Sequence, residues 1–471
     1  MVDSTSKYND CFSTVIVGAG INGLLTAANL STKVSNILVV EKNDSFGGLS
    51  QMIEDGFFLG AHHIAGINKE CFVNDFFNEI GISLDNDFVS VKFVNLFHKD
   101  KIKEIPIILD ELLEYLKNNY PDEIDSINKF FRKIKIYASY FLNADEKGLQ
   151  SMFLETSTIS FEEFLKQYSL SDDICQILTL LSPGYGGIGI QGIAFNNLSL
   201  LISYGLGSGY IKGCNTNLIN YLKDFAENNG VTFLKNCTCT DCKIIDESTL
   251  LIKCNSGGKD FEILTEDVIF CSYPFDILSE IISNTRIKNK LKKFQPGTTV
   301  FRLFAKLDYE IPSLKGDTVY MGNYDIKNMD ENILLSSESF RLPICMIYSD
   351  GKKIMFTFLT SPANESKIDV DKIVDMITLE IPELSNIMSS IFTTCNLEYK
   401  KITNTTWGSV FGWERDQFVF MNSNLFSPEL RGFRGIYISG NWSTDYGVYG
   451  AIRTADKVCK KVLDNKSRRA K

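Results

Sequence analysis

Histidine and tryptophan are scarce in this chain of 471 residues, which contains three of each. Two of the histidines, His62 and His63, are adjacent, and adjacent residues of a strand point to opposite faces of a sheet. The twelve cysteines include Cys237, Cys239 and Cys242, but no second ligand pair of suitable spacing accompanies these three. A metal site is therefore not expected, and the cysteines are interpreted as free thiols in a reducing cytoplasm.

Positive charge is also in short supply, because 48 Lys and Arg against 58 Asp and Glu give a formal net charge of −10. The phosphate backbone of a nucleic acid requires a basic face, so nucleic acid is not expected as the main partner. Two local basic runs, residues 286–293 and 466–471, are interpreted as solvated surface or a frayed tail. Peripheral contact with a membrane stays open as the alternative interpretation.

The sequence shows no mark of export or of a membrane span. Met1 to Ser13 is polar and has no apolar core like that of a signal peptide. Residues 174–211 contain no charged side chain, but Pro183 and many glycines interrupt them. This segment is therefore interpreted as apolar pocket lining or buried packing rather than as a spanning helix.

One motif stands out against these absences. At Val15 to Ala28 an apolar strand enters a glycine turn and then an Ala/Leu-rich helix. In this G-x-G-x-x-G pattern Gly18 permits the tight turn, Gly20 lets backbone N–H groups approach a pyrophosphate, and Gly23 lets the helix lie close to the strand. Because the helix N-terminus adds partial positive charge, the motif predicts a phosphate site.

Three later features extend this site to a whole cofactor. The strand at residues 37–40 ends in Glu41, whose carboxylate can accept hydrogen bonds from ribose hydroxyls. The pair Gly47-Gly48 lets backbone pass close to a second, bulkier part of the cofactor. Another strand–glycine–helix motif at residues 435–453 places a second anion or ring site hundreds of residues from the first. Two such distant sites favour a large cofactor that is bound along its whole length.

The remaining patterns predict two interleaved units. Apolar residues at helical spacing predict a mostly helical region over residues 70–200, with a β-hairpin at Val91–Ile107 and helices at Leu109–Leu116 and Ile124–Phe141. The rest of the chain predicts helices at Leu218–Asn228 and Val370–Ile381 and strands at residues 230–234, 249–254, 268–271, 298–307, 339–359 and 392–401.

Together these motifs resemble the superfamily of FAD-dependent amine oxidases and phytoene desaturases, which includes the carotenoid desaturases. The resemblance implies an α/β fold, with a Rossmann-like FAD-binding domain of the GR2 type and an interleaved α+β substrate domain. The implied FAD-binding domain comprises residues 10–95, 205–300 and 400–465, and the substrate domain comprises residues 96–204 and 301–399.

The resemblance also implies which residues hold FAD. They are Gly18, Ala19, Gly20, Ile21, Asn22, Gly23, Glu41, Lys42, Gly47, Gly48, Leu49, Ser50, Gly60, Ala61 and His62 near the N-terminus, Cys239 beside the adenine, and Gly440, Asn441, Val448, Tyr449 and Ala451 near the C-terminus. Candidates for the catalytic and substrate side are His62, His63, Arg302, Trp413 and Tyr446.

Departures from the family pattern bear on the reaction. Gly447 stands where amine oxidases carry an aromatic cage residue, as in carotenoid desaturases, and Arg302 replaces a lysine near the flavin. We therefore expect an FAD-dependent oxidoreductase that transfers a hydride between flavin N5 and a hydrophobic small molecule, in a desaturation or related redox step. The alternatives are a flavin amine or amino-acid oxidase and, from another class, a non-catalytic FAD-containing binding or escort protein. The substrate, the electron acceptor (oxygen, quinone or another) and the oligomeric state stay open.

Overall fold

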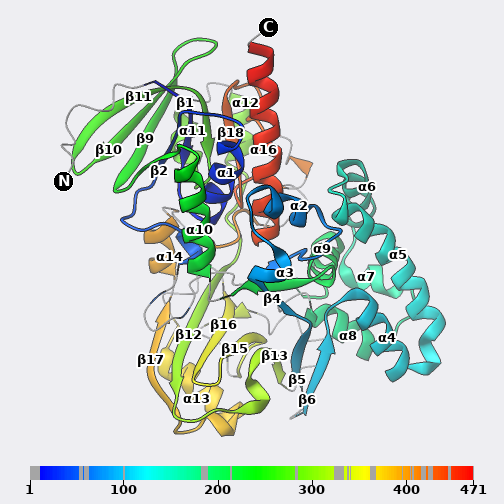
Figure 1. The fold of residues 1–471 in the computed structure, drawn as a ribbon. Coiled ribbons are helices and arrows are strands. Elements are labelled where there is room, and N and C mark those ends of the chain that lie inside the picture. The colour runs from blue at the N-terminus through cyan, green and yellow to red at the C-terminus, as the bar shows by residue number, and fades with distance from the viewer. Residues whose placement is uncertain are drawn as a thin grey trace.

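The computed structural model describes residues 11–51, 53, 57, 63–98, 101–181, 189–212, 215–281, 285–322, 334–336, 339, 341–360, 368–394, 396–403, 405, 408–414, 419, 421–422, 428–443 and 447–469. The predictions for Gly60, Ala61, His62 and Tyr446 lie outside these residues. Figure 1 shows two β-sheets, one above the other, and a group of helices to their side.

The first sheet has seven strands drawn from three separated segments of the chain. In spatial order they are β8 (Thr232–Leu234), β2 (Ile37–Val40), β1 (Cys11–Val17), β11 (Lys259–Phe270), β10 (Leu250–Ser256) and β9 (Cys237–Ile244), with β18 (Ile436–Ile438) also paired to β11. The strands β8, β2, β1, β11 and β18 run parallel to one another, whereas β10 pairs antiparallel with both β11 and β9. Parallel strands bring their carboxyl ends to one edge, which is where ligands bind in open α/β sheets.

Helices cover the parallel part of this sheet. The helix α1 (Ile21–Ser31) is buried from Asn22 to Ser31 and packs between α16 (Gly447–Arg469) and α10 (Asn215–Asn228). Both α1 and α16 begin at glycine-containing turns that follow parallel strands, β1 and β18 respectively. Their N-termini therefore lie at the same edge of the sheet.

A second, eight-stranded sheet lies below the first in Figure 1. Its strands in order are β17 (Met388–Thr394), β12 (Thr299–Leu307), β16 (Lys353–Thr360), β15 (Cys345–Ser349), β13 (Gly316–Gly322), β5 (Phe93–His98) and β6 (Lys101–Pro106), with β14 (Leu334–Leu335) paired to β16. The helix α13 (Val370–Glu380) packs through Ile373, Met376 and Ile377 against an apolar core on this sheet. Two short helices, α11 (Phe275–Ile281) and α12 (Thr285–Leu291), lead into β12, and α14 (Asn396–Thr403) follows β17.

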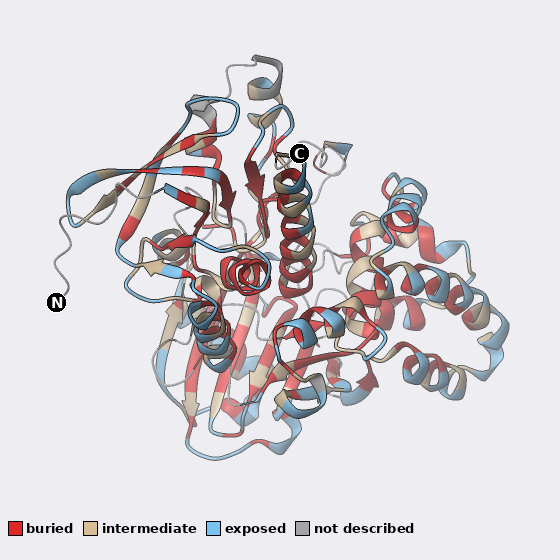
Figure 2. Cartoon of the chain, turned by 45° about the horizontal axis from the view of Figure 1, so that its top comes forward, coloured by how far each residue is buried: buried red, intermediate tan, exposed pale blue. Residues whose placement is uncertain are grey.

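The third part is mostly helical. It contains α4 (Leu109–Asn119), α5 (Ile124–Leu142), α6 (Glu146–Thr156), α7 (Phe161–Lys166), α8 (Asp172–Leu181) and α9 (Ala194–Gly205). A three-stranded sheet of β3 (Ile64–Ala65), β7 (Ser208–Ile211) and β4 (Phe88–Val91) and the helices α2 (Phe72–Glu79) and α3 (Leu84–Asp87) join it to the rest. Figure 2 shows burial concentrated in the strands and central helices, while the outer helices are exposed along one side.

Two expected strands are wrong. The segment 339–359 forms two strands, β15 and β16, rather than one, because Asp350 and Gly351 make a turn between them. Gly351 has φ +98°, and the Asp350 carboxylate accepts the backbone N–H groups of Lys352 and Lys353. The strand expected at 392–401 ends at Thr394, and α14 takes its place. The hairpin at 91–107 and the helices at 109–116, 124–141, 218–228 and 370–381 are confirmed to within a few residues.

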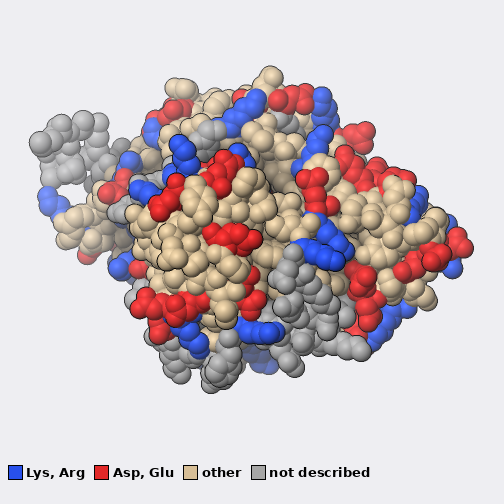
Figure 3. Space-filling model, turned by 90° about the horizontal axis from the view of Figure 1, so that it is seen from below, with Lys and Arg blue, Asp and Glu red and all other residues tan. Residues whose placement is uncertain are grey.

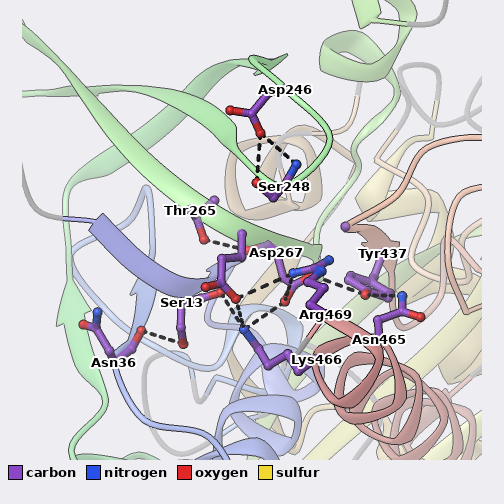
Figure 4. A network of polar contacts seen from close by, with 12 residues as sticks. Ser13, Asn36, Asp246, Ser248, Thr265, Asp267, Tyr437, Asn465, Lys466 and Arg469 are labelled. Atoms are coloured by element: carbon purple, nitrogen blue, oxygen red, sulfur yellow. Dashed lines mark hydrogen bonds and ion pairs between the residues drawn. The ribbon is translucent and has the colours of Figure 1, made fainter. Parts of the chain in front are cut away.

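A buried carboxylate ties the C-terminal helix to the first sheet (Figure 4). Asp267 lies in the part of β11 that pairs with β1, and it has no exposed surface. It accepts both Nη groups of Arg469, at 2.9 and 3.3 Å, and lies 3.1 Å from the Lys466 ammonium. The hydroxyl of Tyr437 donates to it from β18. This charge network fixes the C-terminal end of α16 to the first sheet. The N-terminal end of the same helix begins at the edge of that sheet.

The described helices include none that combines the length and apolar character needed to cross a bilayer. On the face seen in Figure 3, acidic and basic side chains are interspersed, and the part drawn in colour has no broad area of one sign.

Candidate cofactor and substrate cavity

The glycine turn after β1 has the close contacts that its sequence predicts. Gly18 has φ +100°, a conformation that few residues other than glycine adopt. A Cβ atom on Gly23 would lie 1.9 Å from the Gly18 carbonyl oxygen, so the first turn of α1 can approach the strand only without one. At Gly20 the nearest atom to such a Cβ is 3.9 Å away, in Gly48. The turn therefore leaves open space at Gly20, where the pyrophosphate is expected.

Glu41 is fixed at the end of β2 beside this turn. Its side chain is only 6% exposed, and its Oε2 accepts the backbone N–H of Ala19 at 2.7 Å. Its Oε1 accepts the backbone N–H of Asn43 at 2.9 Å. Because each carboxylate oxygen can accept two hydrogen bonds, both retain capacity for ribose hydroxyls. The residues present thus fit a dinucleotide. Gly20 has no side chain to block a phosphate, and Glu41 offers a buried carboxylate that is held in place for a ribose.

A cavity of about 310 Å³ runs from this turn to the face of the second sheet. Most of the residues predicted to bind cofactor or substrate lie on its wall, namely Gly18, Gly20, Ile21, Asn22, Glu41, Lys42, Gly48, Leu49, Ser50, His63, Cys239, Arg302, Asn441, Val448 and Ala451. Segments more than 400 residues apart in sequence therefore meet around one space. The volume is within the usual range for a ligand pocket.

Other predicted residues do not line the cavity but contact residues that do. Ala19, Gly23, Gly47 and Gly440 shape the backbone of the turns rather than the surface of the cavity. The Trp413 indole donates to the Trp442 carbonyl at 3.1 Å and packs on its ring, and it is Trp442 that reaches the cavity.

Tyr449 likewise turns away from the cavity. Its hydroxyl donates to the carbonyl of Phe141 at 3.1 Å, and its ring packs against Phe72. Its side chain therefore helps to hold α16 to the helical region, while its neighbour Val448 reaches the wall.

Apart from Arg302 and His63, the residues of the cavity floor were not predicted from the sequence. Arg302 on β12, Thr357 on β16, Met346 on β15 and Val319 on β13 are direct neighbours across four strands, and all line the cavity. A second row, two residues along, adds Met355, Tyr348 and Asp317. Because successive side chains of a strand point to opposite faces of the sheet, the sequence indicates which residues of one strand share a face. Only the register between strands shows which residues of different strands lie side by side on that face.

A close contact between His63 and Asp317 lies at one end of the floor. The Nε2 of His63 lies 3.1 Å from the Asp317 carboxylate, and both side chains are about 95% buried, being 5% and 4% exposed. The Tyr210 ring stacks beside His63 with centroids 6.0 Å apart. Burial first, and the nearby Asp317 charge as well, raise the pKa of the Tyr210 and Tyr348 hydroxyls, which therefore stay protonated as hydrogen-bond donors.

The nucleotide end contains a lysine and a thiol in unusual surroundings. Burial lowers the pKa of Lys42, although the adjacent Glu41 opposes this, and its ammonium donates to the Lys401 carbonyl. Burial raises the pKa of the Cys271 thiol to about 12, so it is not ionised at neutral pH and is no nucleophile. Within the described ranges, no group of three or more His, Cys, Asp or Glu side chains is arranged to hold a metal ion.

Comparison with known proteins identifies relatives along nearly the whole chain. A family model described as flavin-containing amine oxidoreductase matches residues 21–463. The chain is 22% identical over 487 aligned positions to the 4,4′-diapophytoene desaturase (4,4′-diaponeurosporene-forming) of Staphylococcus aureus, covering 90% of this chain and 93% of that protein. It is 21% identical to the "inactive all-trans-retinol 13,14-reductase" of Danio rerio, covering 70% of this chain but only 59% of that relative's length.

Solved structures share the fold. A putrescine oxidase variant superposes with a TM-score of 0.65 at 14% identity, covering 96% of this chain and 99% of that one. An oxidoreductase from Methanosarcina mazei superposes with a TM-score of 0.60 at 14% identity, covering 96% and 100%. The predicted α/β fold, with a cofactor-binding part and a substrate-binding part, is confirmed.

Proposed function

Because the chain belongs to the flavin-containing amine oxidoreductase family, we propose that it is an FAD-dependent oxidoreductase acting on an apolar small molecule. The proposed reaction is a C–C desaturation or a related redox step. FAD, when bound, supplies the hydride-accepting or hydride-donating chemistry. The protein supplies orientation, a water-poor space and substrate selection.

The residues for holding FAD follow from the wall of the cavity. Gly18 and Gly20 would take the pyrophosphate at the N-terminus of α1, and Glu41 the adenosine ribose. Asn441 and Val448, at the second helix N-terminus, would contact the ribitol and ring end. Asn441 carries no charge, and its amide already donates to the Val410 carbonyl at 3.0 Å, which orients its oxygen.

The observation that carries the substrate class is the composition of the floor. Beside its polar groups, the strands of the second sheet also present Val300, Met346, Met355 and Leu359 to the cavity. Burying apolar substrate surface there contributes about 25 cal/mol per Å². Gly447 also lines the cavity, and apart from its chain neighbours no atom of the described residues lies within 4 Å of where its Cβ would be.

The relatives favour the same proposal without deciding the reaction. One is named as a 4,4′-diapophytoene desaturase and another as an inactive all-trans-retinol 13,14-reductase. The second name keeps a non-catalytic FAD-containing protein as a candidate. A flavin amine or amino-acid oxidase is the other, supported by the family model.

Anaerobic flavin spectroscopy on the purified protein separates these candidates. Denaturation is expected to release FAD, and a colourless protein that does not take up added FAD would overturn the proposal. The oxidised protein is then mixed with diapophytoene, retinol, putrescine or amino acids, and the dithionite-reduced protein is mixed with polyenes. Hydride exchange between the flavin and polyenes supports the proposed reaction. Bleaching of the flavin absorbance by amines or amino acids supports an oxidase. A flavin whose absorbance does not change with any of these compounds supports a binding protein.

A further inference from the structure

Arg302 is a buried cation in the wall of the cavity. It lies on β12, between β17 and β16 in the eight-stranded sheet, and is 7% exposed. Its Nε donates to the Thr357 hydroxyl at 3.1 Å, and its Nη1 lies 3.4 Å from the Tyr399 hydroxyl. Tyr399 in turn shares a hydrogen bond of 3.0 Å with Thr394. These hydroxyls hold the guanidinium in one place and use only part of its five N–H donors.

The partners of Arg302 are all neutral. Among the residues that the structure describes, no carboxylate lies within ion-pair distance of this side chain. Two other well-buried arginines differ in this respect, since Arg453 pairs with Glu146 at 2.9 Å and Arg469 with Asp267 at 2.9 Å. A buried charge without a counter-charge is unfavourable, so an anion in the cavity would be stabilised beside Arg302.

The other carboxylate on the floor does not provide that anion. Asp317 lies on β13, three strands from β12, which corresponds to a separation of about 14 Å across the sheet. Its carboxylate lies 3.1 Å from the Nε2 of His63. Apolar side chains separate the two ends, with Met346 between Thr357 and Val319 in the row of Arg302. The floor thus offers one cationic end followed by an apolar stretch.

We propose that Arg302 binds the carboxylate of an amphipathic substrate whose apolar part lies along this floor. A guanidinium presents parallel N–H donors that match the two oxygens of a carboxylate, so it selects this group over a neutral alcohol. The inference rests on the proposed function, because it names the substrate class of the same cavity. It makes the carboxylate the recognition group and leaves the redox step to the apolar part of the molecule.

A pair of ligands that differ only in this group tests the proposal on the FAD-loaded protein. Binding of all-trans-retinoate and all-trans-retinol is titrated anaerobically, by quenching of tryptophan fluorescence and by perturbation of the flavin absorbance. Retinoate is expected to bind about tenfold more tightly, the gain of one charge-assisted contact. Equal affinity for the two ligands overturns the proposal, whatever any variant does.

Variants identify the residue responsible. Arg302→Met keeps an extended side chain without the charge, and it is expected to reduce the preference for retinoate to about one. Lys306→Met removes a positive charge from the same strand outside the cavity wall and is expected to leave the preference unchanged. Arg302→Lys, which retains the charge but not the fork, serves if the methionine variant does not fold, and it is expected to retain only part of the preference.

A second readout separates the substrate from the cofactor as the source of the anion. The midpoint potential of the bound flavin is measured in the wild type and in Arg302→Met. An unchanged preference for retinoate with a shifted potential would assign the guanidinium to the flavin and overturn the proposal. These binding measurements need no turnover. If retinoate and retinol bind equally, the proposed redox function is still tested independently by the hydride-exchange assay. If instead no hydride exchange is seen but retinoate is still preferred, the protein is a carboxylate-binding flavoprotein.

Discussion

The carboxylate of Glu41 accepts the backbone N–H of Ala19 at 2.7 Å and so joins the end of β2 to the glycine turn after β1. This bond positions the carboxylate and also uses a backbone donor of the turn. The proposed ribose contact and the shape of the proposed phosphate site are therefore coupled through one side chain.

Replacing this carboxylate is expected to weaken FAD retention. Glu41→Ala should cost about 1–3 kcal/mol of FAD binding, since charge-assisted hydrogen bonds to ribose are lost. Glu41→Gln is the matched control, because its amide oxygen can still accept the Ala19 N–H while the charge is gone. Affinity is measured by FAD titration of the apoprotein. Unchanged affinity in both variants would mean that the ribose is bound elsewhere.

Gly20 is expected to be needed for FAD binding, whereas Gly23 is expected to be needed for stability. At Gly20 the backbone has φ −67°, and a Cβ there would have its nearest neighbouring atom 3.9 Å away, so Gly20→Val should fold and yet exclude the phosphate. Gly23→Ala should instead lower the free energy of unfolding by about 1–3 kcal/mol through overpacking against Gly18. Denaturant unfolding of the apoproteins and FAD titration distinguish the two effects. A Gly20→Val protein that binds FAD normally would contradict the assignment.

Gly447 is expected to control the width of the cavity near α16. It has φ +69°, so any substitution costs about 1–2 kcal/mol of backbone strain. Gly447→Ala and Gly447→Tyr share this strain, but only the tyrosine fills the cavity. The tyrosine variant should lose affinity for bulky polyenes relative to the alanine variant, as followed by flavin perturbation. Equal affinities in the two variants would show that the substrate does not reach this residue.

The network of Asp267 is expected to matter for stability more than its exposed neighbours do. Asp267→Asn leaves Arg469 partly buried without its carboxylate, and should cost about 3–5 kcal/mol. Glu266→Gln removes a carboxylate that is 47% exposed and pairs with the same two cations, and should cost less than about 1 kcal/mol. Chemical denaturation measures both. Similar losses for the two variants would show that burial of the pair adds little.

Stability is expected to fall in alkaline solution. Burial raises the pKa of the Cys71 thiol to about 11 and those of Cys175, Cys242 and Cys271 to about 12, from an ordinary value of 9.0. Above about pH 9 the unfolded chain loses these protons and the folded chain keeps them, so the free energy of unfolding decreases as pH rises. Melting temperatures from about pH 8 to about pH 11 test this. A Cys242→Ala variant should show a shallower decrease, and an equal slope would refute the contribution of that thiol.

Much of the cofactor site could be predicted from the sequence because it is built from local backbone. The positive φ of Gly18 and the contact of Gly23 with the Gly18 carbonyl depend on residues a few positions apart. Glu41 follows directly from the end of a buried strand. The fold class, the β5–β6 hairpin and the main helices likewise follow from spacing of apolar residues and from glycines. The domain boundaries and the contacts to FAD stay predictions.

Most of the proposed substrate side was decided by tertiary structure, although Arg302 and His63 were candidates from the sequence. Arg302, Thr357, Met346 and Val319 belong to four strands, and only the register of the second sheet aligns them in one row. The pairing of His63 with Asp317 joins two sheets from distant parts of the chain. Trp413 and Tyr449 were expected at the site, but packing turned their side chains toward Trp442 and Phe141. A short-range pattern determines which residues have special backbone conformations, whereas long-range pairing determines which side chains share a cavity.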